Sequence, residues 1–250
     1  MAIDAFIKAN DASEFEQVIA LSAEQYEVDD LIKYYLMARA VMKEQRIDNE
    51  LVFAYAKGGE RWLGDLETFV GEPNQANAEQ CGDRCFDDKL YLAAEILYKR
   101  VSNNQKLAQT YVNLKKYQLA FEAAKRADVP KVWKAVCFAC VRAKEFAMAA
   151  LCGQHIIIHP DHLEDLNAFY EKFGYWPQLI SLLEQGMNLE RTHQGIYTDL
   201  GIMFAKYEPK RLMDFIRAYN QKLMIPRLIR ECERYQMWPE AVYLHAIYEQ

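Results

Sequence analysis

The most reactive side chains in this sequence belong to its six cysteines, two of which stand in a Cys-x-x-Cys pattern. Cys137 and Cys140 have the spacing of a zinc ligand pair or of a redox motif. No second Cys-x-x-Cys completes four ligands, and the pair lies mid-helix in an apolar run. We therefore expect buried structural cysteines, with every thiol free in a reducing cytosol: Cys81, Cys85, Cys137, Cys140, Cys152 and Cys232.

Three histidines form a second group that could bind a metal. His155, His159 and His162 follow i, i+4, i+7 spacing, which would place them on one helix face beside Cys152. Pro160 interrupts that helix, and no His-Glu-x-x-His motif occurs. The sequence therefore predicts packing and capping histidines rather than a metal site.

Paired carboxylates are the remaining groups that could serve as an acid and a base. Asp87-Asp88 and Glu164-Asp165 are such pairs, yet acidic residues are also favoured at exposed helix starts, where we expect these to lie. A Gly-rich phosphate loop, a Gly-x-Ser-x-Gly elbow and a dinucleotide fingerprint are all missing. We therefore predict no catalytic residue, no cofactor and no enzyme.

Composition indicates the class of fold that positions these residues. The chain has 250 residues, 52% of them hydrophobic, with only 10 Gly and 7 Pro. Helix formers dominate, which predicts an all-α protein. A net charge of −6 argues against nucleic acid as a general partner, and no uninterrupted apolar run is long enough for insertion into a membrane. The expected location is cytoplasmic.

A repeated aromatic position indicates how the helices are organised. Trp62, Tyr91, Tyr117, Phe146 and Trp176 are 29, 26, 29 and 30 residues apart, and Trp238 continues the pattern. Each starts a stripe of apolar residues at helical spacing. The sequence thus predicts helical hairpins of about thirty residues, seven or eight in all, stacked into a solenoid. Small residues should allow close helix approach: Ala93, Ala94, Ala123, Ala149 and Ala150.

A longer period and several prolines refine this arrangement. The Ala-Lys of Phe53–Lys57 matches that of Met203–Lys206 at an offset of 149 residues, which suggests a super-repeat of nearly that length. Asp128-Val129-Pro130 predicts an N-cap followed by an early proline, and Gly71–Asn74 predicts a break. Helices should also begin near three further prolines: Pro160, Pro177 and Pro239.

With hairpins nested in such a super-repeat, the sequence resembles the clathrin heavy chain repeat, in the proximal leg. The resemblance covers the whole chain, through segments such as AIDAFIKANDAS, FVGEPNQANAEQCGDRCFDDKLY, VWKAVCFACVRAKEF, LCGQHIIIHPDHLEDL and MNLERTHQGIYTDLGIMFAKYEP. It implies a right-handed α-solenoid of stacked helical hairpins. Residues 1–50 would end one repeat, 51–198 would form a complete one, and 199–250 would begin the next.

The resemblance also implies a structural role. Clathrin heavy chain legs interweave into the coat of vesicles in endocytosis and intracellular traffic, on the cytoplasmic face of coated pits, and the proximal leg carries a light chain. The expected partners are therefore a clathrin light chain and other heavy chain legs. Candidate light-chain contacts are a basic stripe and an aromatic anchor: Lys89, Lys99, Lys134, Arg227, Arg230 and Trp238. The alternative is a clathrin-repeat subunit of a vacuolar sorting or tethering complex.

Overall fold

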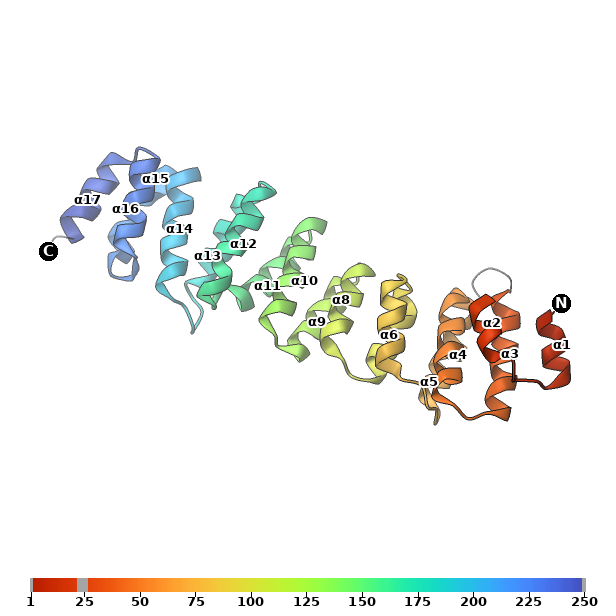
Figure 1. The fold of residues 1–250 in the computed structure, drawn as a ribbon. Helices are drawn as coiled ribbons and strands as arrows, with labels where there is room; N and C mark the ends of the chain where they lie inside the picture. Colours follow the sequence, from red (N-terminus) through yellow and green to blue (C-terminus); the bar gives the residue numbers. More distant parts are fainter. Residues whose placement is uncertain (1, 22–26, 249–250) are drawn as a thin grey trace. The chain divides into compact units, whose positions relative to one another are not determined.

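The computed structural model describes residues 2–21 and 27–248, which form helices and short turns without any strand. The chain divides into two compact units, residues 1–127 and 128–250. Within each unit, helices that follow one another in the chain lie side by side (Figure 1). The predicted class, an all-α stack of helical hairpins, is confirmed.

The described residues of the first unit form nine α-helices and one 3₁₀ helix. Their bounds are α1 (Ala2–Ala9), α2 (Phe15–Leu21), α3 (Val28–Val41), α4 (Gln45–Lys57), η1 (Gly59–Trp62), α5 (Leu63–Gly71), α6 (Ala78–Asp87), α7 (Tyr91–Arg100), α8 (Asn104–Asn113) and α9 (Tyr117–Ala127). The pairs α6–α7 and α8–α9 are hairpins, and α7 also packs on α8. The break predicted at Gly71–Asn74 separates α5 from α6.

In the second unit, the described residues form four hairpins. Their helices are α10 (Pro130–Ala143), α11 (Phe146–Ile157), α12 (Pro160–Lys172), α13 (Trp176–Gly186), α14 (Gln194–Tyr207), α15 (Pro209–Tyr219), η2 (Asn220–Lys222), α16 (Ile225–Arg234) and α17 (Trp238–Tyr248). The first helices of successive hairpins form a row, in which α12 packs on α10, α14 on α12 and α16 on α14. The division into two units does not test the repeats predicted at residues 1–50, 51–198 and 199–250, so these bounds stay a prediction.

Five hairpins share one turn, and it explains the aromatic period. The residue two before each repeat aromatic has a positive φ. In the α6–α7 turn, Lys89 N–H donates to Phe86 O at 3.0 Å and Leu90 N–H to Cys85 O at 2.8 Å, which is a Schellman closure. The other four turns repeat both bonds. Their left-handed residues are Lys89, Lys115, Lys144, Gly174 and Gln236.

The aromatic that follows each turn begins the second helix of its hairpin, as predicted for Tyr91, Tyr117, Phe146, Trp176 and Trp238. Trp62 differs, because it ends η1 just before α5. One prediction is wrong. Asp87 and Asp88 are exposed, but they lie at the end of α6, just before the left-handed Lys89, and not at a helix start. Glu164 and Asp165 are exposed in the second turn of α12.

Prolines mark helix starts as expected. Pro130 and Pro160 each occupy the first position of a helix, and Pro177 the second. Pro239 is the second residue of α17. The predicted N-cap at Asp128 is wrong, because Val129 holds that position without a side-chain cap. Asp128 instead has a φ of 45°, and its carboxylate accepts a long 3.5 Å bond from Trp133 Nε1.

Small residues bring the paired helices together. Ala93, Ala94, Ala123 and Ala149 are buried as predicted, whereas Ala150 is half-buried. Gly82 on α6 allows the Tyr98 ring of α7 to approach closely, because a Cβ there would lie 2.8 Å from Tyr98 Cε1. The hairpin cores are therefore built on small side chains against large ones.

Candidate functional site

The cysteines with the spacing of reactive groups lie in the core. All six are free and buried. Cys137 Sγ on α10 donates to Ala149 O on α11 at 3.4 Å, and burial raises the pKa of this thiol to about 12. A hydrogen bond with Cys140, and then burial, also raise the pKa of Cys152. Thiols that resist ionisation are poor nucleophiles, so these residues pack as predicted.

The three histidines do not share one helix, because the chain breaks before Pro160 as predicted. His155 on α11 stacks on Trp133 with ring centroids 4.0 Å apart, whereas His159 precedes α12 and His162 lies within it. Among the described residues, no three His, Cys, Asp or Glu side chains are placed to hold a metal ion. One histidine that the sequence did not single out, His193, accepts from Gly195 N–H at the start of α14.

Two predicted light-chain contacts, Lys89 and Lys99, lie in the first unit. Lys89 is exposed and is the left-handed residue of the α6–α7 turn. Lys99 on α7 donates to the buried Glu95 at 2.6 Å, and Lys116 donates to the same carboxylate at 2.8 Å. Although burial opposes ionisation, the two ammonium groups hold the pKa of Glu95 below its usual value. Lys99 therefore has an intrachain partner, and Lys89 presents its charge to solvent.

In the second unit, Arg227 is tied to a buried carboxylate. Its Nη1 lies 2.9 Å from Asp199 Oδ1, close enough for an ion pair although not aligned as a hydrogen bond. Asn167 Nδ2 donates to the other oxygen of Asp199 at 2.6 Å. Asn167, Asp199 and Arg227 come from α12, α14 and α16, so one carboxylate joins three helices of the row.

Burial dominates the electrostatics of that carboxylate. The side chain of Asp199 is 3% exposed, and desolvation raises its pKa although Arg227 and Asn167 act in the opposite direction. The side chain of Arg227 is 46% exposed. The arginine thus has two faces, one paired with Asp199 and one open to solvent.

The other predicted contacts of the second unit are less constrained, except for Lys134. Arg230 on α16 and Trp238 at the start of α17 belong to the same hairpin, and Trp238 is 58% exposed. Lys134 lies on α10, further back in the row, where it forms an ion pair with Asp165 of α12. Arg227, Arg230 and Trp238 therefore all belong to the α16–α17 hairpin. The single stripe joining all six residues stays a prediction.

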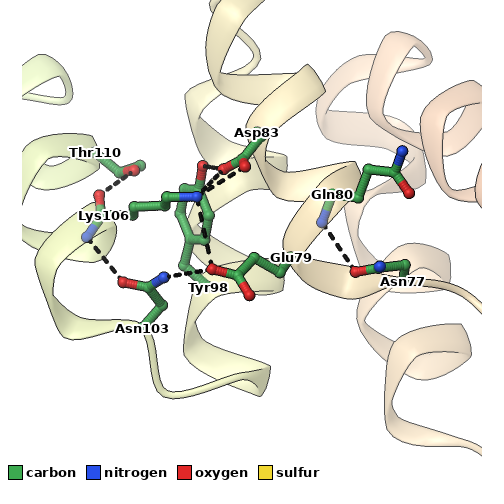
Figure 2. A network of polar contacts seen from close by, with 8 residues as sticks. All are labelled: Asn77, Glu79, Gln80, Asp83, Tyr98, Asn103, Lys106 and Thr110. Atoms are coloured by element: carbon green, nitrogen blue, oxygen red, sulfur yellow. Dashed lines mark hydrogen bonds and ion pairs between the residues drawn. The ribbon is translucent and has the colours of Figure 1, made fainter.

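A polar network in the first unit was not anticipated from the sequence. Figure 2 shows Asp83 of α6 facing Tyr98 of α7 and Lys106 of α8. Lys106 Nζ donates to both carboxylate oxygens at 2.6 and 2.7 Å, and Tyr98 Oη donates at 2.7 Å. Burial opposes ionisation more than any single donor favours it, but the donors together hold the pKa of Asp83 below its usual value. The network therefore joins three helices of the first unit.

The arrangement described so far is a scaffold of stacked hairpins with charged and aromatic side chains on its surface. The family described as "Region in Clathrin and VPS" matches residues 6–148 and 155–250. The chain therefore belongs to this family of clathrin-type helical repeats. No described helix is both long and apolar enough to cross a membrane.

Its relatives narrow the resemblance to clathrin heavy chains. Clathrin heavy chain 1 of Oryza sativa subsp. japonica is 47% identical over 249 residues, covering 100% of this chain and 14% of the relative. The clathrin heavy chain of Drosophila melanogaster is 42% identical over 249 residues, again covering 100% of this chain and 15% of the relative. The chain thus spans about a seventh of the length of these relatives, and it matches them from end to end.

Proposed function

We propose that this chain is a leg segment of a clathrin-type vesicle coat and acts by protein contacts rather than by catalysis. The observation that carries the proposal is the identity of 47% over 249 residues to a clathrin heavy chain. A stack of hairpins suits this role, because each hairpin contacts mainly its neighbours and the row presents a long surface. The proposed partners are other heavy chain legs and a light chain, at the cytoplasmic face of coated pits and vesicles.

The proposed light-chain surface is the set predicted from sequence, centred on Arg230 and Trp238. Arg230 is exposed on α16 and Trp238 is the most exposed tryptophan at a repeat position. Tryptophan and arginine are the residue types enriched at the centres of protein interfaces, and here one hairpin exposes both. A tethering complex of the vacuolar sorting type is the weaker alternative, because the relatives matched over the whole chain are named clathrin heavy chains.

Coat function is tested with a chimera. The matching segment of a clathrin heavy chain is replaced by this chain, and cages are examined by electron microscopy after assembly with light chain. Closed cages that retain light chain are expected. A chimera that forms soluble trimers but no cages would contradict the role in a coat.

The light-chain surface is tested on the chain itself by calorimetric titration with a purified clathrin light chain. We expect the Arg230→Glu and Trp238→Ala variants to bind at least about tenfold more weakly. The matched control is Arg126→Glu, an equally exposed arginine on α9, which should bind like the wild type. Equal affinity of all variants would show that the light chain binds elsewhere.

A further inference from the structure

Five aromatic rings form a continuous chain at the ends of two neighbouring hairpins in the second unit. Phe138 of α10 stacks on Phe169 of α12, with centroids 3.9 Å apart, and Phe169 lies 5.0 Å from Phe173. Phe173 lies 6.3 Å from Tyr175, which lies 4.9 Å from Phe146 of α11. We call these five residues the aromatic patch.

The patch is only partly covered. Phe138, Phe146, Phe169 and Tyr175 are half-buried, which is enough to pack the α10–α11 hairpin on the α12–α13 hairpin. Phe173 is 41% exposed, beside the left-handed Gly174 that closes α12. Hairpin packing accounts for the four half-buried rings. It gives no reason for a fifth, outward ring at the tip.

Cations surround the patch without acidic partners in the described part of the chain. Arg142, Lys144 and Lys172 are exposed and take part in no ion pair there. The Arg142 guanidinium lies 6.0 Å from the Phe169 ring. Of the nearby acidic residues, Glu171 is held by Lys206 at 2.8 Å, and Glu145 is exposed. The surface around Phe173 is therefore apolar at its centre and positive at its rim.

We propose that the aromatic patch is a docking site for an acidic segment of another protein, which places an apolar side chain against Phe173 and its carboxylates against the surrounding cations. An uncovered ring with unpaired cations is complementary to a chain that carries both features. Three cations are few for tracking a nucleic acid backbone, which also carries no apolar side chain to cover Phe173. The contact area is small, so the interaction is weak and gains strength only by repetition along an assembly.

The test uses the whole chain and a fluorescein-labelled peptide of fifteen residues that is rich in Glu and carries two central leucines. Binding is followed by fluorescence anisotropy at low and at physiological salt. The wild type should bind this peptide at least about tenfold more tightly than a peptide with Lys at every Glu position, and less tightly as salt rises. Phe173→Ser and the double variant Lys144→Glu/Lys172→Glu should each weaken binding about tenfold.

Two controls match these changes. Leu151→Ser removes an equally exposed apolar side chain from α11, at 44% exposure, and Lys131→Glu reverses an exposed charge at the start of α10. Both should bind the acidic peptide like the wild type. The charge-reversal variant keeps every ring of the patch, so it tests the site even if Phe173→Ser unfolds the hairpin tip.

Three results would overturn the proposal. The first is no binding of the acidic peptide, and the second is equal binding of the acidic and basic peptides. The third is self-association of the wild type in sedimentation that Phe173→Ser abolishes, because the occupant would then be a second copy of this chain. None of these results bears on cage formation by the chimera, so the two experiments test the coat function and the aromatic patch independently.

Discussion

Two carboxylates do the same structural task in different surroundings. Asp83 links α6, α7 and α8 in the first unit, and Asp199 links α12, α14 and α16 in the second. The pKa of Asp83 is lowered, whereas that of Asp199 is raised by burial. The side chain of Asp83 is 45% exposed and keeps part of its hydration, while that of Asp199 is 3% exposed and has lost nearly all of it.

This difference indicates that an ion pair between hairpins can either stabilise or destabilise the fold. A partly solvated pair adds a Coulomb attraction to a carboxylate that has lost only part of its hydration. A buried one must first recover the free energy of desolvation, and Arg227 supplies only part of it. Neutralising the carboxylate should therefore change the free energy of unfolding in opposite directions at the two sites. Loss of Arg227, the cation of the buried site, should have the largest effect.

Arg227→Ala should have the largest effect. It leaves Asp199 buried with only the amide of Asn167, and we expect it to lower the free energy of unfolding by about 2 kcal/mol. Urea unfolding followed by circular dichroism measures this. In an Asp199→Asn background, Arg227→Ala should lower the free energy of unfolding much less, because residue 199 then carries no charge that needs a partner. Equal costs in both backgrounds would show that Arg227 acts only through packing.

Asp199→Asn alone should stabilise the protein at neutral pH, by about 1 kcal/mol. A folded pKa above the unfolded value gives a contribution that is fully present below the ordinary value of 3.8 and is lost as pH rises through the folded pKa. As pH rises from 3.8 through the folded pKa of Asp199, the wild type therefore loses this stability and the Asp199→Asn variant does not. Unfolding measured between pH 4 and pH 7 should show the variant's advantage growing with pH. An advantage that shrinks with pH would contradict a raised pKa.

The hairpin architecture was predictable from the sequence because its signals are local. A proline fixes the first helical turn, and an aromatic with following apolar residues marks the second helix, as at Pro177 and Trp176. The turn itself was not predictable, since its left-handed position holds Lys in three hairpins, and lysine carries no turn signal. For that reason Asp87 and Asp88 were assigned to the wrong helix end.

The candidate site was less predictable because charge partners depend on tertiary contacts. Arg227 looks like an exposed interaction residue in the sequence, and its partner Asp199 comes from the preceding hairpin. The aromatic patch was hidden for the same reason. Phe138 and Phe169 are far apart in the chain and meet only when two hairpins stack.

Asp83→Asn should have the opposite sign to Asp199→Asn and a smaller size. The lowered pKa of Asp83 stabilises the fold above the ordinary value of 3.8, and this contribution is lost as pH falls through the folded pKa. At pH 7 the variant should be less stable by under about 1 kcal/mol, because the carboxylate is solvated. The loss should shrink in 1 M salt, which screens an exposed pair more than the buried one.

Substitutions at the left-handed turn positions should have the smallest effect on stability. The effect should be the same in both units. Lys115 and Gln236 have φ values of 58° and 60° in turns with the same hydrogen bonds. A side chain strains that conformation, while glycine loses more backbone entropy on folding, so Lys115→Gly and Gln236→Gly should each stabilise by about 0.5 kcal/mol. Gly174→Ala, at a φ of 73°, should destabilise. Thermal unfolding of the three variants measures this. Opposite signs for Lys115→Gly and Gln236→Gly would mean that the units differ in their turns as well as in the burial of their carboxylates.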